Sequence, residues 1–174
     1  EAAPVAVVGT RPVENAAVED VVAAVNSGAH ADAIPAEARD YASYCSEGGY
    51  RRLRELIGSD DETPREAVIK SLEDARLRGL GGAGFPAGRK WRIVRDYDGP
   101  RLMAVNIDEG EPGTFKDRYY LERDPHRFFE GMLIAAQVVG IDGIYIYLRD
   151  EYAGVRALLE RELEALKSDP PCRL

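Results

Sequence analysis

Cysteine and histidine are scarce in this sequence, and their scarcity excludes several kinds of site. The two cysteines, Cys45 and Cys172, lie far apart and lack the close spacing of metal ligands or of a disulfide framework. The two histidines, His30 and His126, are equally isolated, so we expect all four residues to be structural. The sequence therefore predicts no metal site within these residues.

Long apolar runs and clusters of positive charge are also missing. No stretch approaches the ~20 apolar residues that a transmembrane helix needs, and no signal peptide is visible. The net charge is −8, and lysines and arginines are mixed among the acids, which argues against binding to nucleic acid or to an anionic membrane surface. We therefore expect a cytoplasmic protein with no nucleic-acid partner and no direct membrane contact.

What the chain does have is enough length and apolar content for a folded core. It contains 174 residues, of which 45% are hydrophobic. It begins at Glu1 instead of Met and stops just after Pro170 and Pro171, from which we expect a piece of a longer protein. Residues 1–35 are rich in alanine and valine and are predicted to be an N-terminal arm or the tail of an upstream domain.

The most unusual stretch, Gly79–Lys90, contains five glycines. A backbone without Cβ atoms can approach a flat or phosphorylated ligand closely and turn its N–H groups toward it. Gly79, Gly81 and Gly84 match the dinucleotide pattern G-x-G-x-x-G, but a helix is predicted before them where that fingerprint requires a strand. A Walker loop fails as well, because no Ser or Thr follows the lysine. A flexible linker, or a helix end followed by a turn, is the alternative interpretation.

Hydrophobic periodicity predicts a protein of the α/β class. Gly79 is expected to stop the helix that precedes the loop. The later elements form a βαβ unit, for which a right-handed crossover and a first strand buried on both faces are expected. Strands are predicted at 5–8, 102–107 and 143–148, and helices at 18–25, 35–46, 51–57, 63–78, 125–139 and 152–167.

Polar side chains follow the predicted strand at 102–107. They are Asn106, Asp108, Glu109 and Glu111. Ligands of open α/β sheets bind at the carboxyl ends of strands, where acids would accept hydrogen bonds from ribose hydroxyls, a carboxamide or ring N–H groups. The anionic parts of a ligand would then be bound by the basic residues of the same segments, Arg89, Lys90 and Lys116. These residue types suit a nucleotide with a phosphate and a polar flat ring, and a solvated acidic turn is the alternative.

Two segments, Leu77–Trp91 (LRGLGGAGFPAGRKW) and Asn106–Arg118 (NIDEGEPGTFKDR), closely resemble signature segments of one family. It is the flavin-bearing, NADH-oxidising (diaphorase) subunit shared by respiratory complex I, NAD-reducing hydrogenases and NAD-dependent formate dehydrogenases. The resemblance covers about residues 38–166. It implies a Rossmann-like FMN-binding domain, of which residues 36–174 are the first part and which continues beyond this chain.

Two positions in the first segment depart from the family pattern. Leu80 stands where the family usually has Arg, and Ala87 where it usually has Thr. The Leu variant, together with residues 146–152 (IYLRDEY), is most similar to the beta subunit of molybdenum-containing formate dehydrogenases. We therefore expect that branch, with complex I, an NAD-reducing hydrogenase or a non-catalytic scaffold fragment of the same fold as alternatives.

The resemblance implies a role for each matching residue. The residues that would contact FMN are Gly79, Gly81, Gly82, Lys90, Asn106, Asp108, Glu109 and Gly110. The residues that would contact NAD are Phe85, Lys90 and Glu111. Phe85 would stack on the adenine, and Glu111 would face the nicotinamide. Because the flavin exchanges hydride with NAD(H) and single electrons with iron–sulfur clusters, no side chain is assigned as a catalytic acid or base.

The resemblance also implies that these 174 residues do not act alone. The cysteine ligands of a [4Fe–4S] cluster would lie in a part of the subunit absent from this chain, which alone is expected to bind FMN weakly or not at all. The implied partners are other subunits of a complex, including a thioredoxin-like [2Fe–2S] subunit and an iron–sulfur or molybdenum catalytic subunit.

Overall fold

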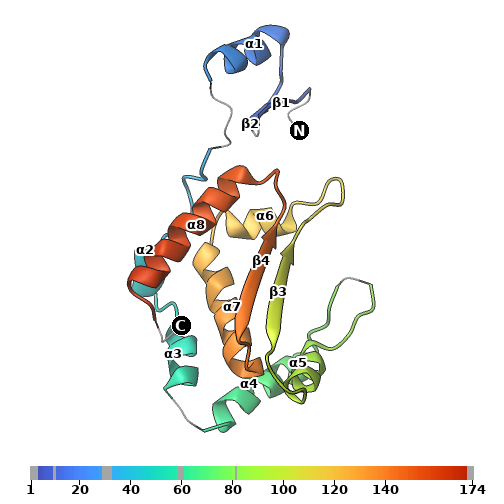
Figure 1. Ribbon diagram of the computed structural model, residues 1–174, viewed down its shortest axis with the longest axis vertical. Helices are drawn as coiled ribbons and strands as arrows, with labels where there is room; N and C mark the ends of the chain where they lie inside the picture. The colour runs from blue at the N-terminus through green and yellow to red at the C-terminus, as the bar shows by residue number, and fades with distance from the viewer. Residues whose placement is uncertain (1–3, 10, 29–32, 59–60, 81, 172–174) are drawn as a thin grey trace.

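A computed structural model of the chain describes residues 4–9, 11–28, 33–58, 61–80 and 82–171. Figure 1 shows a pair of strands flanked by helices, with a smaller N-terminal unit at one end of the molecule. In that unit β1 (Ala6–Val8) and β2 (Arg11–Val13) form an antiparallel hairpin beside α1 (Val18–Asn26). The first strand and the helix were predicted, whereas β2, three residues with a central proline, shows no periodic pattern. The domain boundary at residue 35 stays a prediction.

Three helices follow, and the first is shorter than its sequence predicts. They are α2 (Tyr41–Ser46), α3 (Arg51–Ile57) and α4 (Thr63–Asp74). The prediction for α3 is confirmed, but residues 35–40 are not helical. The Asp40 carboxylate accepts the Ser43 N–H at 2.8 Å, and this cap fixes the start of α2 at Tyr41.

The end of α4 also differs from the prediction, since the helix stops at Asp74 and not before Gly79. Arg76 adopts a left-handed φ of 51°, and the Leu77 N–H donates to the Leu72 carbonyl at 3.1 Å. This is the hydrogen bond of a Schellman-type helix end, in which the left-handed position is usually a glycine. Here an arginine occupies this position, so the expectation that Gly79 ends the helix placed the end of α4 too late.

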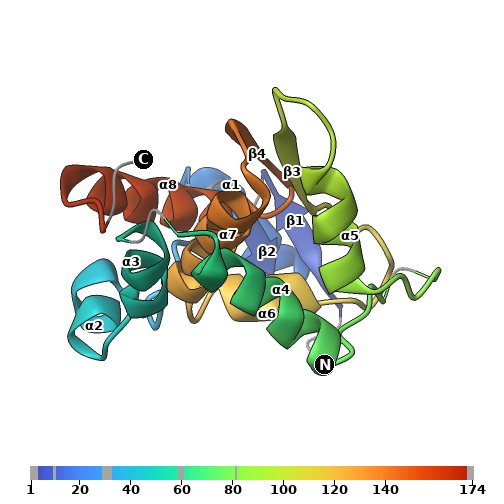
Figure 2. The ribbon, with the colours of Figure 1, turned by 90° about the horizontal axis from the view of Figure 1, so that it is seen from below.

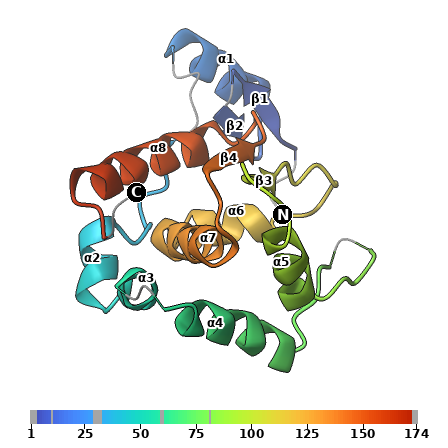
Figure 3. The same cartoon turned by 60° about the horizontal axis from the view of Figure 1, so that its bottom comes forward.

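The remaining elements complete the α/β arrangement. The predictions for β3, α7 and β4 are confirmed, α8 begins one residue later than predicted, and neither α5 nor α6 was predicted. The elements are α5 (Ala87–Arg95), β3 (Leu102–Ile107), α6 (Lys116–Leu121), α7 (Pro125–Val139), β4 (Gly143–Leu148) and α8 (Ala153–Ser168). Figure 3, in which α7 is seen end-on, shows α8, α2, α3, α4 and α5 arranged around it.

The two long strands pair in parallel, from Leu102 opposite Gly143 to Ile107 opposite Leu148. One face of this sheet packs on the core formed with α7 and α8. The other face carries Leu102, Tyr145 and Tyr147, which are 60%, 65% and 60% exposed. The expectation that β3 is buried on both faces is therefore wrong for the described residues, because no element covers this second face.

The core is held by a buried polar contact as well as by apolar packing. Phe129 and His126 are completely buried. The two ring nitrogens of His126 lie 2.8 Å from the Tyr50 hydroxyl and 2.8 Å from the Glu162 carboxylate. This supports the structural interpretation of His126, whereas His30 and Cys172 lie outside the described residues. Within the described part of the chain, no helix is long and apolar enough to cross a membrane, and no group of metal-binding side chains occurs.

Candidate functional site

The glycine-rich stretch forms a projecting loop that is closed at its base by the backbone. The Gly79 N–H donates to the Phe85 carbonyl at 2.9 Å, and the Ala87 N–H donates to the Leu77 carbonyl at 2.8 Å. The chain therefore leaves α4, extends outward and returns beside itself at the start of α5. Figure 1 shows this loop standing clear of the helices.

The loop presents an open backbone. Gly82 and Gly84 have φ values of 100° and 61°, and a Cβ atom on either would meet nothing within 4 Å. Leu80 is 98% exposed and Phe85 is 43% exposed. Gly81, one of the predicted FMN contacts, lies outside the described residues. A flat ligand can lie against this loop without displacing side chains.

Lys90 stands in the first turn of α5, at the root of the loop. Its side chain is exposed and makes no hydrogen bond or ion pair with any described residue. Gly88 packs against α4 so closely that a Cβ atom there would lie 2.6 Å from Glu73 Cγ. Lys90 follows Gly88 by two residues, which places it about 200° further around the axis of an α-helix. Lys90 therefore points away from α4. The Arg89 guanidinium lies 5.7 Å from the centre of the Phe85 ring, so two cations flank the loop.

The chain leaving β3 turns sharply, and its polar groups are exposed. The Asp108 N–H donates to Asn106 Oδ1 at 2.9 Å, and the Glu111 carbonyl accepts the Thr114 N–H at 3.2 Å. Gly110 allows the Asp108 carboxylate to fold over the turn, because a Cβ atom there would lie 2.8 Å from Asp108 Oδ2. The carboxylates of Asp108 and Glu111 form no hydrogen bond or ion pair with the described residues, so both are open to a ligand.

Glu109 differs from these neighbours because its carboxylate is engaged within the protein. Oε1 accepts the Asp117 N–H at 2.8 Å, and Oε2 accepts the Arg118 N–H at 3.1 Å and the Tyr152 hydroxyl at 3.0 Å. Burial by itself raises the pKa of Glu109, but these hydrogen bonds outweigh it and lower that pKa below its ordinary value. Burial and the bond to Glu109 raise the pKa of Tyr152. The contact between Glu109 and FMN stays a prediction.

Arg149, which follows β4, holds the same turn from the other side. Its Nη1 donates to the Glu109 carbonyl at 2.8 Å, and its backbone N–H donates to the Ile107 carbonyl at 3.2 Å. Its guanidinium also pairs with Glu151 and lies 5.5 Å from the centre of the Tyr152 ring. The carboxyl ends of β3 and β4 are thus tied together. Sequence reasoning assigned no role to Arg149 or Tyr152, although their place after a parallel strand was the available signal.

The two segments lie on the same side of the molecule. Figures 1, 2 and 3 show loop 79–86 and loop 108–115 projecting on the side of the β3 edge that does not pair with β4. No hydrogen bond or ion pair joins the two loops among the residues that the structure describes. A cavity of about 250 Å³ lies at the carboxyl end of β3, between this strand, α6 and α7, and Asn106 is in its lining.

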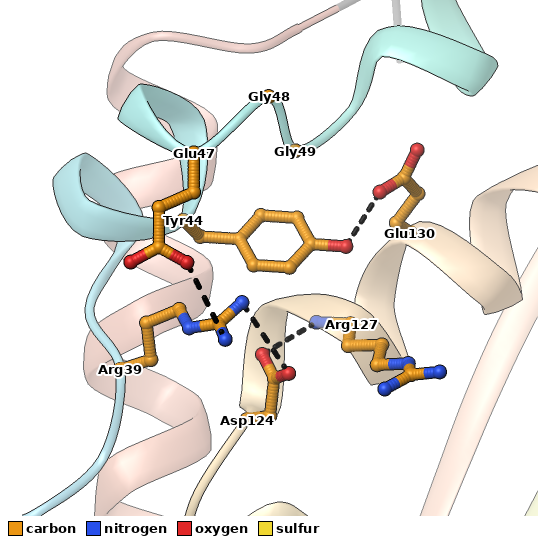
Figure 4. Close-up of a pocket in the computed structure, with 8 residues that line it drawn as sticks. All are labelled: Arg39, Tyr44, Glu47, Gly48, Gly49, Asp124, Arg127 and Glu130. Atoms are coloured by element: carbon orange, nitrogen blue, oxygen red, sulfur yellow. Dashed lines mark hydrogen bonds and ion pairs between the residues drawn. The ribbon is translucent and has the colours of Figure 1, made fainter.

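A second, more polar hollow of about 270 Å³ lies where α2 meets α7 (Figure 4). In it, the Tyr44 hydroxyl donates to Glu130 at 2.5 Å, and Arg39 pairs with Glu47 and Asp124 at 3.5 Å each. These groups form hydrogen bonds and ion pairs with one another, and these contacts link the segment around α2 to α7. None of the predicted site residues lines it.

The free groups of the two loops fit a nucleotide with both anionic and polar parts. The unpaired cation of Lys90 suits a phosphate, and the free carboxylates of Asp108 and Glu111 suit hydroxyl or ring N–H donors. The open backbone at Gly82 and Gly84 leaves room for a flat ring. FMN combines these three features, so the residues present fit it. Together with the parallel strand β3, whose carboxyl end leads into the second of these loops, these groups indicate a nucleotide-binding domain of the α/β class.

Comparison with known proteins identifies the family. Residues 72–170, more than half of the chain, match the family described as the Nuo51 FMN-binding domain. The chain therefore belongs to this family of FMN-binding domains.

Individual relatives agree with that assignment. The chain is 43% identical over 122 residues to an NADH-quinone oxidoreductase subunit of Rhizobium meliloti, with 70% of this chain and 28% of that protein covered. It is 46% identical over 122 residues to the NAD-reducing hydrogenase HoxS subunit alpha of Cupriavidus necator, with 70% and 20% covered. The chain thus spans between a fifth and a third of the length of these two relatives.

A solved structure has the same fold. A chain of the NAD⁺-reducing [NiFe]-hydrogenase in the air-oxidized state superposes with a TM-score of 0.69 at 31% identity, and the match covers 95% of this chain and 31% of that one. The α/β fold with a glycine-rich loop after a helix and parallel strands joined by crossover helices is therefore confirmed.

Proposed function

We propose that the chain is part of an NADH-oxidising flavoprotein subunit and helps to bind both FMN and NAD. The observation that carries the proposal is the unpaired Lys90 at the root of an open glycine loop, which projects on the same side of the molecule as loop 108–115. The second loop carries Asp108 and Glu111, whose carboxylates are free among the described residues. Membership of an FMN-binding family and similarity to subunits of an NADH-quinone oxidoreductase and an NAD-reducing hydrogenase support it.

In this proposal the chain positions its ligands and the flavin supplies hydride transfer to or from the nicotinamide. The backbone of the glycine loop and the Lys90 ammonium hold FMN, while Asn106 and Asp108 accept hydrogen bonds from its hydroxyl or ring N–H groups. Phe85 offers a stacking surface for the adenine of NAD, and Glu111 faces its nicotinamide side. No side chain of the site is needed as an acid or base.

We also propose that the subunit works within a complex on the cytoplasmic side. Iron–sulfur clusters would supply or take up single electrons there: a [4Fe–4S] cluster would be held by another part of the subunit and a [2Fe–2S] cluster by a thioredoxin-like partner. The similarity of the chain to subunits of a quinone oxidoreductase and of a hydrogenase supports this placement.

The complex that we favour is an NAD-dependent formate dehydrogenase with a molybdenum catalytic subunit. Leu80 in place of the usual Arg, and the segment 146–152, support this choice. Leu80 is almost fully exposed, so a Leu in place of Arg there does not disturb the fold. The complex purified through this subunit should contain molybdenum and reduce NAD⁺ with formate. NAD⁺ reduction with hydrogen, or NADH oxidation coupled to quinone, would assign it to one of the other complexes.

The test of FMN binding is a comparison of two lysine substitutions in the complete protein, including any segments that flank these residues. Lys90→Ala removes an unpaired cation from the site, whereas Lys70→Ala removes an exposed lysine that pairs with Asp74 within α4. A charge-assisted hydrogen bond contributes about 1.5–3 kcal/mol, so Lys90→Ala should weaken FMN binding roughly 10-fold to 150-fold. Flavin fluorescence measures this affinity.

Lys70→Ala should bind FMN like the parent, and both variants should unfold at nearly the parent temperature. Equal FMN affinity in the two variants would defeat the assignment of Lys90. A parent protein without any flavin absorbance, even after reconstitution with FMN, would favour the non-catalytic scaffold.

A further inference from the structure

We propose that Glu109 and Tyr152 form a clamp that fixes the ligand-binding turn after β3, and that Glu109 is a positioning residue and not a ligand contact. The inference rests on the proposed function, because the turn that the clamp holds is the one that carries Asp108 and Glu111. It concerns how that site acquires its shape.

The first observation is the backbone of the turn. Glu109 has a φ of 43°, in the left-handed region that few residues other than Gly, Asn and Asp adopt readily. Such a conformation is unfavourable for a glutamate and persists only where the surroundings enforce it. The free carboxylates of Asp108 and Glu111 stand on either side of this residue. The direction of both therefore depends on what holds Glu109.

The second observation is what holds it. The Glu109 carboxylate accepts two backbone N–H groups at the start of α6 and the Tyr152 hydroxyl, at distances between 2.8 and 3.1 Å. Its carbonyl accepts Arg149 Nη1 at 2.8 Å. Tyr152 is only 5% exposed, and the guanidinium groups of Arg118 and Arg149 lie 5.3 and 5.5 Å from the centre of its ring. The clamp is thus anchored in α6, at the N-cap of α8 and just after the end of β4.

The third observation separates Glu109 from the other acids of the turn. Among the described residues, Asp108 and Glu111 have free carboxylates, whereas the Glu109 carboxylate already has three donors. Its three donors occupy three of the roughly four acceptor sites of a carboxylate, and two of these donors are N–H groups in the first turn of α6. Because the Glu109 carboxylate already binds the start of α6 and the Tyr152 hydroxyl, we infer that it acts by fixing the conformation of the turn. A turn that already has its binding conformation binds a ligand more tightly, because less conformational entropy is lost on binding.

The test uses the complete protein with FMN and NADH and five variants: two single substitutions in the clamp, the double variant that combines them, and two controls. Tyr152→Phe removes one hydroxyl, and Glu109→Gln keeps the size of the side chain but replaces one acceptor oxygen with an NH₂ group. Tyr97→Phe and Glu160→Gln are the matched controls, because both residues are exposed and their side chains make no hydrogen bond or ion pair with the described residues. For each variant, flavin fluorescence gives the Kd for FMN, ferricyanide reduction gives kcat and KM for NADH, and thermal unfolding gives Tm.

We expect Tyr152→Phe to weaken FMN binding or raise the KM for NADH about tenfold, equivalent to about 1.4 kcal/mol. The kcat of flavin-saturated enzyme should change less than twofold, because the clamp touches no reacting atom. The double variant should lose no more than Glu109→Gln alone, since Tyr152 acts through Glu109. The two controls should match the parent protein.

Three results would overturn the clamp. The first is a lowered Tm in Tyr152→Phe with unchanged Kd and KM, which would leave a purely structural bond. The second is a loss in Glu109→Gln with none in Tyr152→Phe, which would indicate direct contact between Glu109 and the ligand. The third is additive losses in the double variant. Failure of the parent protein itself to bind FMN would instead refute the proposed function, so the two failures are distinguishable.

Discussion

Replacing Gly88 by alanine should destabilise the protein, although alanine is the better helix former. Gly88 lies in the first turns of α5, where α5 crosses α4. A Cβ atom there would lie 2.6 Å from Glu73 Cγ, 3.0 Å from the Ile69 carbonyl oxygen and 3.2 Å from the Glu73 backbone nitrogen. The Glu73 side chain can move aside, but the two backbone atoms belong to α4 and cannot move without shifting the helix.

Gly131, inside α7, provides the matched control. It is exposed, and a Cβ atom there would meet nothing within 4 Å. Gly131→Ala should therefore stabilise the protein by up to about 1 kcal/mol, the usual difference in helix propensity. At Gly88 the same gain is opposed by overpacking, which costs about 1–3 kcal/mol. The two variants should differ by that cost, or by roughly 2–12 °C in Tm for a chain of this size.

Thermal and urea unfolding of both variants measure the difference. Because α5 carries Lys90, a shifted α5 should also weaken FMN binding in Gly88→Ala and not in Gly131→Ala. Equal stability of the two variants would refute the packing of α5 on α4, and with it the direction assigned to Lys90.

Two further predictions concern the ends of the strands. Arg101 donates to the carbonyls of Arg95, Tyr97 and Gly140, at the ends of α5 and α7, so Arg101→Ala should lower the free energy of unfolding by about 2–3 kcal/mol. Arg51→Ala, which removes an exposed side chain from α3, should cost less than about 1 kcal/mol. Urea titrations measure both losses, and equal losses would contradict the role of Arg101. The folded-state pKa of Glu109 lies below its ordinary value of 4.5, so its contribution to stability is present above that pH and is lost as the pH falls through the lower folded-state value. Glu109→Gln should therefore flatten the fall of Tm with acid below about pH 4.5, and an unchanged acid limb would argue against the hydrogen bonds of Glu109.

The sequence predicts the fold well where a single local pattern decides the structure. α7 begins with an Asp–Pro pair and alternates apolar residues at helical spacing, and its observed bounds match the prediction. β3 and β4 are apolar runs between turn residues, and both have the predicted bounds. In these elements the start signal, the periodicity and the stop signal agree.

The prediction fails where tertiary contacts decide the structure. α5 was not predicted because Gly88 falls within the glycine-rich stretch of the sequence. In the structure Gly88 lies in the helix, and the absence of a side chain there allows α5 to pack closely on α4. α6 is only six residues long, and its first N–H groups are satisfied by Glu109, a residue outside the helix. The open second face of the β3–β4 sheet is likewise a property of packing that an apolar strand pattern does not show.

The candidate site was found in part. The two loops are recognisable from glycine and acid content, and the structure brings both to one side of the molecule. Which acids are free and which one is engaged depends on Tyr152 and on the start of α6, so the sequence alone placed Glu109 together with Asp108 and Glu111. Only the hydrogen bonds distinguish Glu109 from these two residues.

A structure of the complete protein with FMN bound tests the central claim most directly. We expect the flavin to lie between loop 79–86 and the turn after β3, with the Lys90 ammonium on an anionic or carbonyl oxygen of FMN, Asp108 within hydrogen-bonding distance of it, and Glu109 still bound to Tyr152. Density for the flavin in the hollow of Figure 4, or anywhere out of reach of both loops, would contradict the account.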